Sequence, residues 1–225
     1  MKKITAVIFD MDGVIVDSNP VHKKVLHEFC DKYGKELSDE YIREKLFGRT
    51  NREWIPMVFG SLTDERVEAL SNEKERMFRD LFNPKKHVVP GFVEFLDRVK
   101  QRDIPAVVAT SAPKENAGYI LGELSVTGMF DAVLHMSHFT NSKPHPEPYL
   151  KAAKAVDASP RDCIVFEDSI SGIKSGLAAG CSVVGVATTH THEELNLCHL
   201  VVDDFRDPAL TLPELQKLIY KSSPD

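Results

Sequence analysis

The 225-residue sequence lacks the marks of several large classes of protein. It holds only four cysteines, and no two of them have the C-x-x-C spacing of a zinc or dithiol redox site. No stretch approaches the roughly 18 consecutive apolar residues of a membrane span. Lysine and arginine number 28 against 34 acidic residues and form no basic block. The expected partners therefore include neither nucleic acid nor membrane.

The N-terminus does not predict secretion. Lys2 and Lys3 precede an apolar run, but Asp10 and Asp12 end it before it reaches the length of a signal-peptide core. We therefore expect a cytoplasmic protein with reduced cysteines. The length suits one to two domains and a monomer.

Five short apolar runs alternate with helical patterns along the chain. Near-continuous apolar runs are typical of strands buried on both faces of a parallel sheet. We therefore predict an α/β fold with a doubly wound, Rossmann-like parallel sheet, whose ligands bind beyond the carboxyl ends of the strands. The predicted strands are 4–9, 104–110, 132–136, 163–166 and 182–187.

Residues 16–86 interrupt this alternation, because they show helical periodicity and no convincing strand. We predict an all-helical cap domain over 16–86, inserted into a Rossmann-like core domain of residues 1–15 and 87–225. Asn19 is the predicted cap of a first helix that has Pro20 at its first position, and periodicity predicts two more helices over 38–47 and 63–82. A third helix of the cap, around Trp54, stays open. Two later helices are predicted to begin at the T-x-x-E boxes 191–194 and 211–214.

Four acids follow two of the predicted strands. Asp10 and Asp12 end the first strand, where side chains two apart share a face, and Glu167 and Asp168 follow the strand 163–166. Like charges about 4 Å apart repel by about 4 kcal/mol at an effective dielectric near 20, so such a group needs a cation. Oxygen-only ligands favour Mg²⁺, which commonly bridges carboxylates to a phosphate.

Hydroxyl and amino groups lie at two further strand ends. Thr110 and Ser111 precede a helix that begins near Lys114, which is a natural anion site, although Thr110 alone also fits an ordinary helix cap. Lys143 lies in a loop stiffened by Pro144 and Pro146 and can face a carboxylate and a phosphoryl oxygen. The alternative for Lys143 is a solvated loop lysine.

Taken together and in this order, these motifs resemble the haloacid dehalogenase superfamily. Three segments are similar to its small-molecule phosphatase and β-phosphoglucomutase branch, and the resemblance extends over nearly the whole chain, including the position and length of the helical cap. The segments are 9–14 (FDMDGV), 142–148 (SKPHPEP) and 166–173 (FEDSISGI).

The resemblance implies specific roles for the acids. Asp10 is the implied nucleophile, which forms an aspartyl-phosphate. Asp12 is the implied acid and base, which protonates the leaving alcohol and then takes a proton from water. Asp10, the backbone carbonyl of Asp12 and Asp168 are the implied Mg²⁺ ligands, and Glu167 completes the metal site from close by.

The remaining motif residues are implied to handle the phosphoryl group. Thr110, with Ser111 beside it, holds a phosphoryl oxygen, and Lys143 offsets charge on the nucleophile and the transferring group. Because halide release needs no proton, the presence of an acid at Asp12 favours phosphate esters over the dehalogenase reaction.

The cap is expected to choose the substrate. Lys74 lies within the apolar stripe of the helix 63–82, and the resemblance makes it a substrate contact. From the helical pattern alone, a lysine side chain that extends to solvent is the alternative. The segment 48–52 is similar to a substrate-reading cap loop, which makes Asn51 and Arg52 candidates, but it is longer than the mutase pattern. His22 matches a hinge position, and a helix-surface histidine is the alternative.

We therefore predict a Mg²⁺-dependent phosphatase acting on a small phosphorylated metabolite such as a sugar phosphate. A phosphomutase of the β-phosphoglucomutase kind is the alternative within the superfamily. Outside it, a phosphoacceptor signalling module also uses aspartate, Mg²⁺, threonine and lysine, but its accepting aspartate follows a later strand and no helical cap is inserted.

Overall fold

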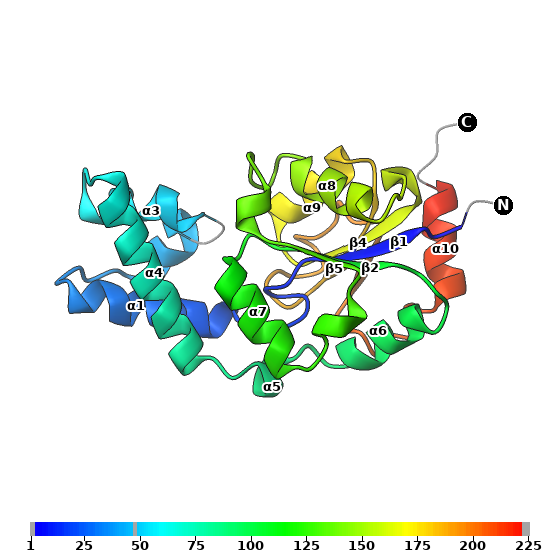
Figure 1. Cartoon of the computed structure of the whole chain (residues 1–225), viewed down its shortest axis with the longest axis horizontal. Coiled ribbons are helices and arrows are strands. Elements are labelled where there is room, and N and C mark those ends of the chain that lie inside the picture. The colour runs from blue at the N-terminus through cyan, green and yellow to red at the C-terminus, as the bar shows by residue number, and fades with distance from the viewer. Residues whose placement is uncertain (1–2, 47–48, 222–225) are drawn as a thin grey trace. The chain divides into compact units, whose positions relative to one another are not determined.

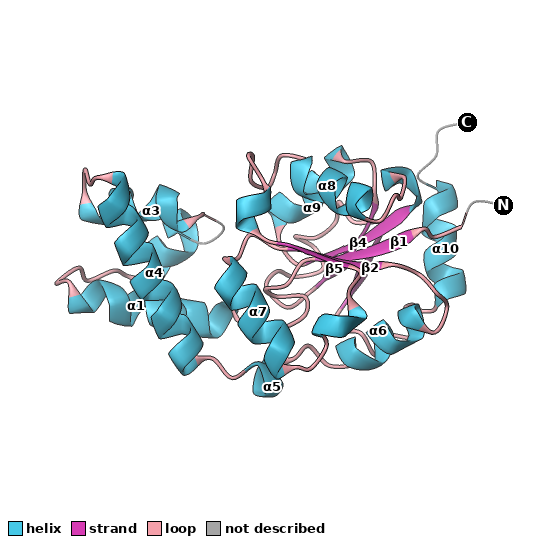
Figure 2. Ribbon diagram, in the orientation of Figure 1, coloured by secondary structure: helices cyan, strands magenta, loops and turns pink. Residues whose placement is uncertain are grey.

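The computed structural model describes residues 3–46 and 49–221. The chain divides into two compact units, which are Met1–Asp17 with Pro84–Asp225, and Ser18–Asn83. We call them the sheet unit and the helical unit. The expected domain boundaries, after residues 15 and 86, lie close to the bounds of these units. Figures 1 and 2 show a sheet with helices in the first unit and helices alone in the second.

The sheet unit contains six parallel strands, which confirms the predicted doubly wound α/β fold. Their order, β3-β2-β1-β4-β5-β6, reverses direction between β1 and β4, so a crevice is expected at the carboxyl ends of these two strands. The strands are β1 (Ala6–Phe9), β2 (Ala106–Ala109), β3 (Ala132–Leu134), β4 (Cys163–Glu167), β5 (Ser182–Val186) and β6 (Leu200–Val202).

The sixth strand was not predicted. It is three residues long and pairs only with β5, at the edge of the sheet. A run this short carries no periodicity that separates it from a loop.

Alternate side chains of the central strands pack into two cores. Ile8 and Val165 join one apolar cluster with residues of α8 (Glu147–Ala155) and α9 (Ile170–Ala178). On the other face, Phe9 stacks on Phe166 at 5.3 Å and contacts the ring of Phe92 at 5.5 Å. Both faces are therefore buried, which explains the near-continuous apolar runs.

Helices cover the two faces separately (Figure 1), with α8 and α9 on one side and α6 and α7 on the other. The remaining α-helices of this unit are α5 (Pro84–His87), α6 (Phe92–Lys100), α7 (Lys114–Glu123) and α10 (Leu212–Lys221).

The helix predicted after Thr211 is present as α10. The helix predicted at Thr191 is absent. Thr191 does receive its capping contact, since its N–H donates to Glu194 Oε2 at 2.9 Å, but residues 192–197 form turns and β6 begins at Leu200.

The helical unit packs its helices around an apolar cluster that includes Phe29, Trp54 and Leu70. Its first helix, capped at Ser18 rather than Asn19, carries Pro20 in its first turn. The segment predicted as one helix over 38–47 is α2 followed by a π-helical turn, and its last residue, Phe47, lies outside the described residues. The α-helices are α1 (Asn19–Lys32), α2 (Asp39–Tyr41), α3 (Asn51–Phe59) and α4 (Asp64–Leu81).

Helix α3, which the sequence left open, starts at a capping box. Thr50 N–H donates to Glu53 Oε2 at 2.7 Å, and this contact stabilises the first turn despite Pro56 within the helix. The sequence carries the T-x-x-E signal for this helix at 50–53.

Across the described parts of the chain, none of the helices combines the length and the apolar character needed to cross a membrane. All four cysteines are free thiols.

Candidate active site

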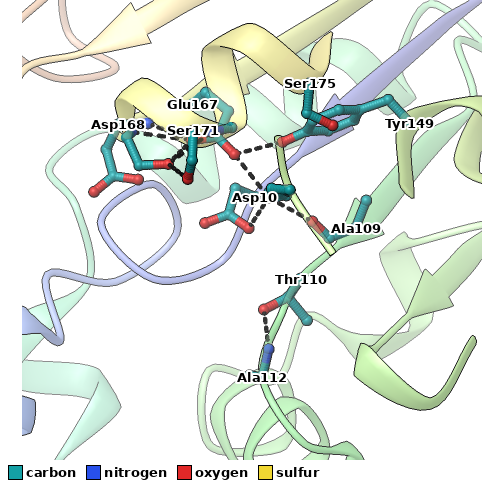
Figure 3. Close-up of polar contacts among 12 residues, drawn as sticks. Asp10, Ala109, Thr110, Ala112, Tyr149, Glu167, Asp168, Ser171 and Ser175 are labelled. Atoms are coloured by element: carbon teal, nitrogen blue, oxygen red, sulfur yellow. Dashed lines mark hydrogen bonds and ion pairs between the residues drawn. The ribbon is translucent and has the colours of Figure 1, made fainter. Parts of the chain in front are cut away.

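Asp10 lies at the carboxyl end of β1. Its backbone N–H donates to the carbonyl of Phe166 at 3.0 Å, which ties the end of β1 to β4, and its side chain is buried. Because Glu167 ends β4 and Asp168 follows it, the parallel register brings these three acids to one edge of the sheet (Figure 3). The predicted gathering of acids from the two strands is present.

Lys143 is the cation of this cluster. Its Nζ lies 2.6 Å from Asp10 Oδ1, 2.7 Å from Glu167 Oε1 and 3.2 Å from the carbonyl of Ala109. Only 7% of its side chain is exposed, so the alternative of a solvated loop lysine is wrong. Burial alone would lower the pKa of Lys143, but the two carboxylates outweigh it and raise that pKa.

Glu167 is fully buried and has a donor on each carboxylate oxygen. Oε1 accepts from Lys143 and from the hydroxyl of Tyr149, the latter at 2.6 Å. Oε2 accepts from the backbone N–H groups of Asp168 and Ser169 and from Ser169 Oγ, each at 3.0 Å. Burial alone would raise the pKa of Glu167, but Lys143 and these hydrogen bonds lower it. Glu167 is therefore an ionised anchor for Lys143.

Asp168 faces a different set of groups. Its Oδ2 accepts a short hydrogen bond from Thr189 Oγ1. Gly13 lies against the same oxygen, because a Cβ at residue 13 would be 2.0 Å from Asp168 Oδ2, and Gly13 has a φ of +82°. Burial, followed by the charges of Glu167 and Asp10, raises the pKa of Asp168 well above its usual range.

The three acids fit a divalent cation. Asp10, Glu167 and Asp168 each offer a carboxylate oxygen, and these atoms lie within 4.8 Å of one another. Three carboxylates and the Lys143 ammonium sum to two negative charges when all are ionised. Burial, together with Glu167 and Asp12, raises the pKa of Asp10 to about 7 although Lys143 opposes this. A buried, oxygen-only group with this charge suits Mg²⁺.

Asp12 lies beyond β1 in a tight turn. β1 ends at Phe9, and Gly13 N–H donates to the carbonyl of Val16 at 2.7 Å, which closes a turn directly after Asp12. Asp12 is half-buried, and its charge contributes to the raised pKa of Asp10. That the side chains of Asp10 and Asp12 share one face stays a prediction.

Thr110 follows β2 on the other side of Asp10, as Figure 3 shows. Its buried Oγ1 accepts from the N–H of Ala112 at 3.0 Å, which leaves its own O–H as a donor. The alternative of a helix cap is wrong, because α7 begins at Lys114 and its capping residue is Pro113. Ser111 is exposed beside this turn.

The cap candidates lie in the helical unit. Lys74 and Glu75 are 6% and 5% exposed, so Lys74 does not extend into solvent, and its Nζ lies 2.8 Å from Glu75 Oε1. His22 Nδ1 is 3.3 Å from Lys74 Nζ, and the His22 ring stacks on Phe78, so His22 is no isolated surface histidine. Lys74, Glu75 and His22 form a polar group in which Lys74 and Glu75 are buried and His22 is half-buried, and which we call the Lys74 cluster.

Asn51 belongs to the Lys74 cluster, whereas Arg52 does not. Asn51 Nδ2 donates to Glu75 Oε1 at 2.7 Å, and its Oδ1 accepts from Trp54 Nε1 at 2.8 Å. Arg52 is exposed. Coulombic attraction from Lys74 and His22 lowers the pKa of Glu75 to about 2, although burial alone would raise it.

Sequence reasoning missed three side chains of the site. Tyr149, in the first turn of α8, was not among the predicted site residues, although its hydroxyl bonds Glu167 and its ring lies 4.9 Å from Lys143 Nζ. Ser169 caps α9 and also bonds Glu167. Thr189 follows β5, and its position at the carboxyl end of a predicted strand was the available signal.

Comparisons with known proteins agree with this geometry. The family model for haloacid dehalogenase-like hydrolases matches residues 7–186, and the chain belongs to that family, as its motifs predicted. A phosphorylated carbohydrates phosphatase of Thermotoga maritima is 33% identical over 182 residues, which are 78% of this chain and 81% of that protein.

Two solved structures resemble the whole chain. A haloacid dehalogenase hydrolase of family IA, variant 3, from Entamoeba histolytica has a TM-score of 0.87 and 30% identity, and the match covers 96% of this chain and 99% of that one. A β-phosphoglucomutase from Clostridium difficile has a TM-score of 0.84 and 28% identity, with 97% and 98% covered. The protein is thus a member of a hydrolase family with a Rossmann-like core.

Proposed function

We propose that the protein is a Mg²⁺-dependent phosphatase that hydrolyses a small phosphorylated metabolite, of the sugar phosphate class, through an aspartyl-phosphate on Asp10. The observation that carries the proposal is the 2.6 Å contact of buried Asp10 with Lys143, within an acidic group at the switch point of the sheet. The similarity to a phosphatase of phosphorylated carbohydrates supports the substrate class.

In the first step, Asp10 attacks phosphorus with a carboxylate oxygen. The bond from phosphorus to the ester oxygen of the substrate breaks, and Asp12 gives its proton to the leaving alkoxide. Lys143, held by Glu167, offsets the charge of Asp10 and of the phosphoryl oxygens. The free O–H of Thr110 donates to one of those oxygens.

In the second step, Asp12 is a carboxylate and takes a proton from water. The water oxygen attacks phosphorus, the acyl-phosphate bond breaks, and inorganic phosphate and Asp10 are released. Phosphoryl transfer depends mainly on positioning and charge stabilisation, which this small set of residues provides.

Asp10, Asp168 and the backbone carbonyl of Asp12 are the proposed holders of Mg²⁺, and the ion supplies positive charge to the transferring group. Glu167 lies in the same acidic group, but its oxygens already accept from Lys143, Tyr149 and neighbouring N–H groups. We therefore assign Glu167 to hold Lys143 and to complete the metal site as a neighbour of the proposed ligands.

The cap residues are proposed to read the organic part of the substrate. Lys74 and His22 supply donors and acceptors from one cluster, and Asn51 shares Glu75 with Lys74. Arg52, exposed near the start of α3, is proposed as an outer contact.

Release of inorganic phosphate from a panel of phosphorylated metabolites tests the proposal. We expect turnover with Mg²⁺, none after EDTA, and recovery when Mg²⁺ is restored. Asp10→Asn should lower turnover by about 10⁴-fold or more while circular dichroism stays unchanged. Substantial activity in Asp10→Asn would refute the nucleophile. A phosphorylated protein that persists without turnover would favour a phosphoacceptor instead.

The similarity to a β-phosphoglucomutase keeps a phosphomutase as the second candidate. Both reactions share the first step and differ in whether water or a substrate hydroxyl accepts the phosphoryl group. Incubation with β-glucose 1-phosphate, β-glucose 1,6-bisphosphate and Mg²⁺ separates them. Glucose 6-phosphate formed without free phosphate would overturn the phosphatase assignment.

A further inference from the structure

The loop after β5 contacts the acidic group through two threonine hydroxyls. Thr188 Oγ1 donates to the carbonyl of Gly13 at 2.5 Å, and Thr189 Oγ1 donates to Asp168 Oδ2 in the short hydrogen bond described above. Gly13 directly follows Asp12. The two hydroxyls therefore bond the two segments that carry the proposed metal ligands Asp12 and Asp168.

The hydrogen bond from Thr189 determines which oxygen of Asp168 is available. Asp168 is buried, so protein donors rather than bulk solvent set the orientation of its carboxylate. Oδ2 is confined between the Thr189 hydroxyl and the backbone of Gly13, where no Cβ would fit. Holding Oδ2 in this way would leave the other oxygen, Oδ1, to face a cation. Partners that orient a metal-binding carboxylate in this way commonly change metal affinity by about tenfold to 100-fold.

We propose that Thr189 is a positioning residue for the divalent cation, which orients Asp168 through its hydroxyl and thereby sets the affinity of the site. The inference rests on the proposed function, since it assigns a role toward the same Mg²⁺. Thr189 is assigned to orient a metal ligand and not to act on the reacting atoms, and no motif of the sequence analysis included it.

A hydroxyl deletion with matched controls tests this role in the full chain. Thr189→Val keeps the shape of the side chain and removes the hydroxyl, Thr189→Ala removes it without the second branch, and Thr189→Ser restores it. Thr191→Val makes the same change two residues away, where the hydroxyl bonds the exposed carboxylate of Glu194. Mn²⁺ binding to the metal-free protein, followed by electron paramagnetic resonance, reports affinity without turnover.

We expect Thr189→Val and Thr189→Ala to bind Mn²⁺ about tenfold to 100-fold more weakly than wild type. Thr189→Ser and Thr191→Val should bind as wild type does. The Mg²⁺ concentration for half-maximal phosphate release should rise by the same factor in the Val and Ala variants, with the rate at saturating Mg²⁺ largely kept.

Two results would overturn the inference while the proposed function stands. One is wild-type Mn²⁺ affinity in a folded Val or Ala variant, and the other is a Ser variant as weak as Val, because the hydroxyl would then not be the cause. Thermal unfolding of each variant separates lost affinity from a lost fold. A wild-type protein that binds no Mn²⁺ would overturn the proposed function and this inference together.

Discussion

Gly172 offers a direct test of how tightly the site is built. It lies in the first turn of α9, where a Cβ would be 1.7 Å from Oε1 and 1.9 Å from the carboxyl carbon of Glu167. The backbone of Gly172 is helical, so alanine is conformationally acceptable and would on its own favour the helix by about 1 kcal/mol. The substitution Gly172→Ala therefore tests space alone.

The expected cost follows from what Glu167 must give up. Its carboxylate has to move, and Oε1 then loses its hydrogen bond with Lys143 or Tyr149. Losing a hydrogen bond to a charged group costs about 1.5–3 kcal/mol. Overpacking adds about 1–3 kcal/mol, and the helix gain offsets about 1 kcal/mol. We expect Gly172→Ala to lower the free energy of unfolding by about 2–5 kcal/mol.

Activity should fall as well as stability. Lys143 contacts both Glu167 and Asp10, so a displaced Glu167 shifts the ammonium away from the nucleophile. A misplacement of about 1 Å in such a site costs about 100-fold in rate. We expect phosphate release by Gly172→Ala to fall by about that factor under conditions where the variant is folded.

Two other helical glycines provide the controls for urea unfolding and phosphate release. A Cβ at Gly118 in α7 meets nothing within 4 Å, so Gly118→Ala should gain about 1 kcal/mol and keep full activity. A Cβ at Gly176 would lie 2.9 Å from Val183 Cγ2, so Gly176→Ala should lose stability without a specific loss of rate. If Gly172→Ala were as stable and active as Gly118→Ala, the steric reasoning would be refuted.

Two further predictions concern the Lys74 cluster. The folded-state pKa of Glu75 is about 2 against an ordinary 4.5. Its charge therefore contributes about 3 kcal/mol to stability above pH 4.5, and this contribution is lost as the pH falls from 4.5 through 2. Urea unfolding should therefore show a gap between wild type and Glu75→Gln that is full at pH 6 and shrinks by pH 3; a constant gap would contradict it. Lys74→Ala should raise KM about tenfold or more, or change the preferred substrate, with kcat less affected. Unchanged kinetics across the phosphate panel would remove Lys74 from the substrate contacts.

The sheet and its acidic edge were predictable because both follow from local patterns. A strand buried on both faces must be apolar throughout, so the strand 163–166 is recognised without knowing which strands pair with it. The acids that follow it must then lie at the carboxyl edge of the sheet. The position of Lys143 also needed the family resemblance, because a lysine in a loop before two prolines is more often solvated.

The partners of the acids were not predictable in the same way. Tyr149 reaches Glu167 across 18 positions and Thr189 reaches Asp168 across 21, and these pairs depend on how α8 and β5 lie against β4. A hydroxyl after a strand has the same local sequence whether it bonds a carboxylate or water. Such contacts appear only once the register of the sheet is known.

Glu75 shows a second limit of pattern reasoning. Successive residues on a helix point about 100° apart, so a single apolar stripe predicts burial for Lys74 or Glu75 but not for both. Helix α4 contacts both α1 and α3, so a wide face of it is covered and both charges are buried. The resulting ion pair explains why a lysine can occupy an apolar stripe without extending into solvent.

The charges of the acidic group connect its chemistry to its stability. Asp10, Glu167 and Asp168 face one ammonium in a buried space, and burial raises the pKa of both Asp10 and Asp168. A protonated Asp10 is a poor nucleophile, so the reactive state requires further positive charge, and a divalent cation balances the two remaining negative charges. The arrangement that makes Asp10 reactive therefore costs stability by itself. The apolar cores on both faces of the sheet, with residues such as Ile8 and Phe9 from the same strand, are what allow the fold to hold it.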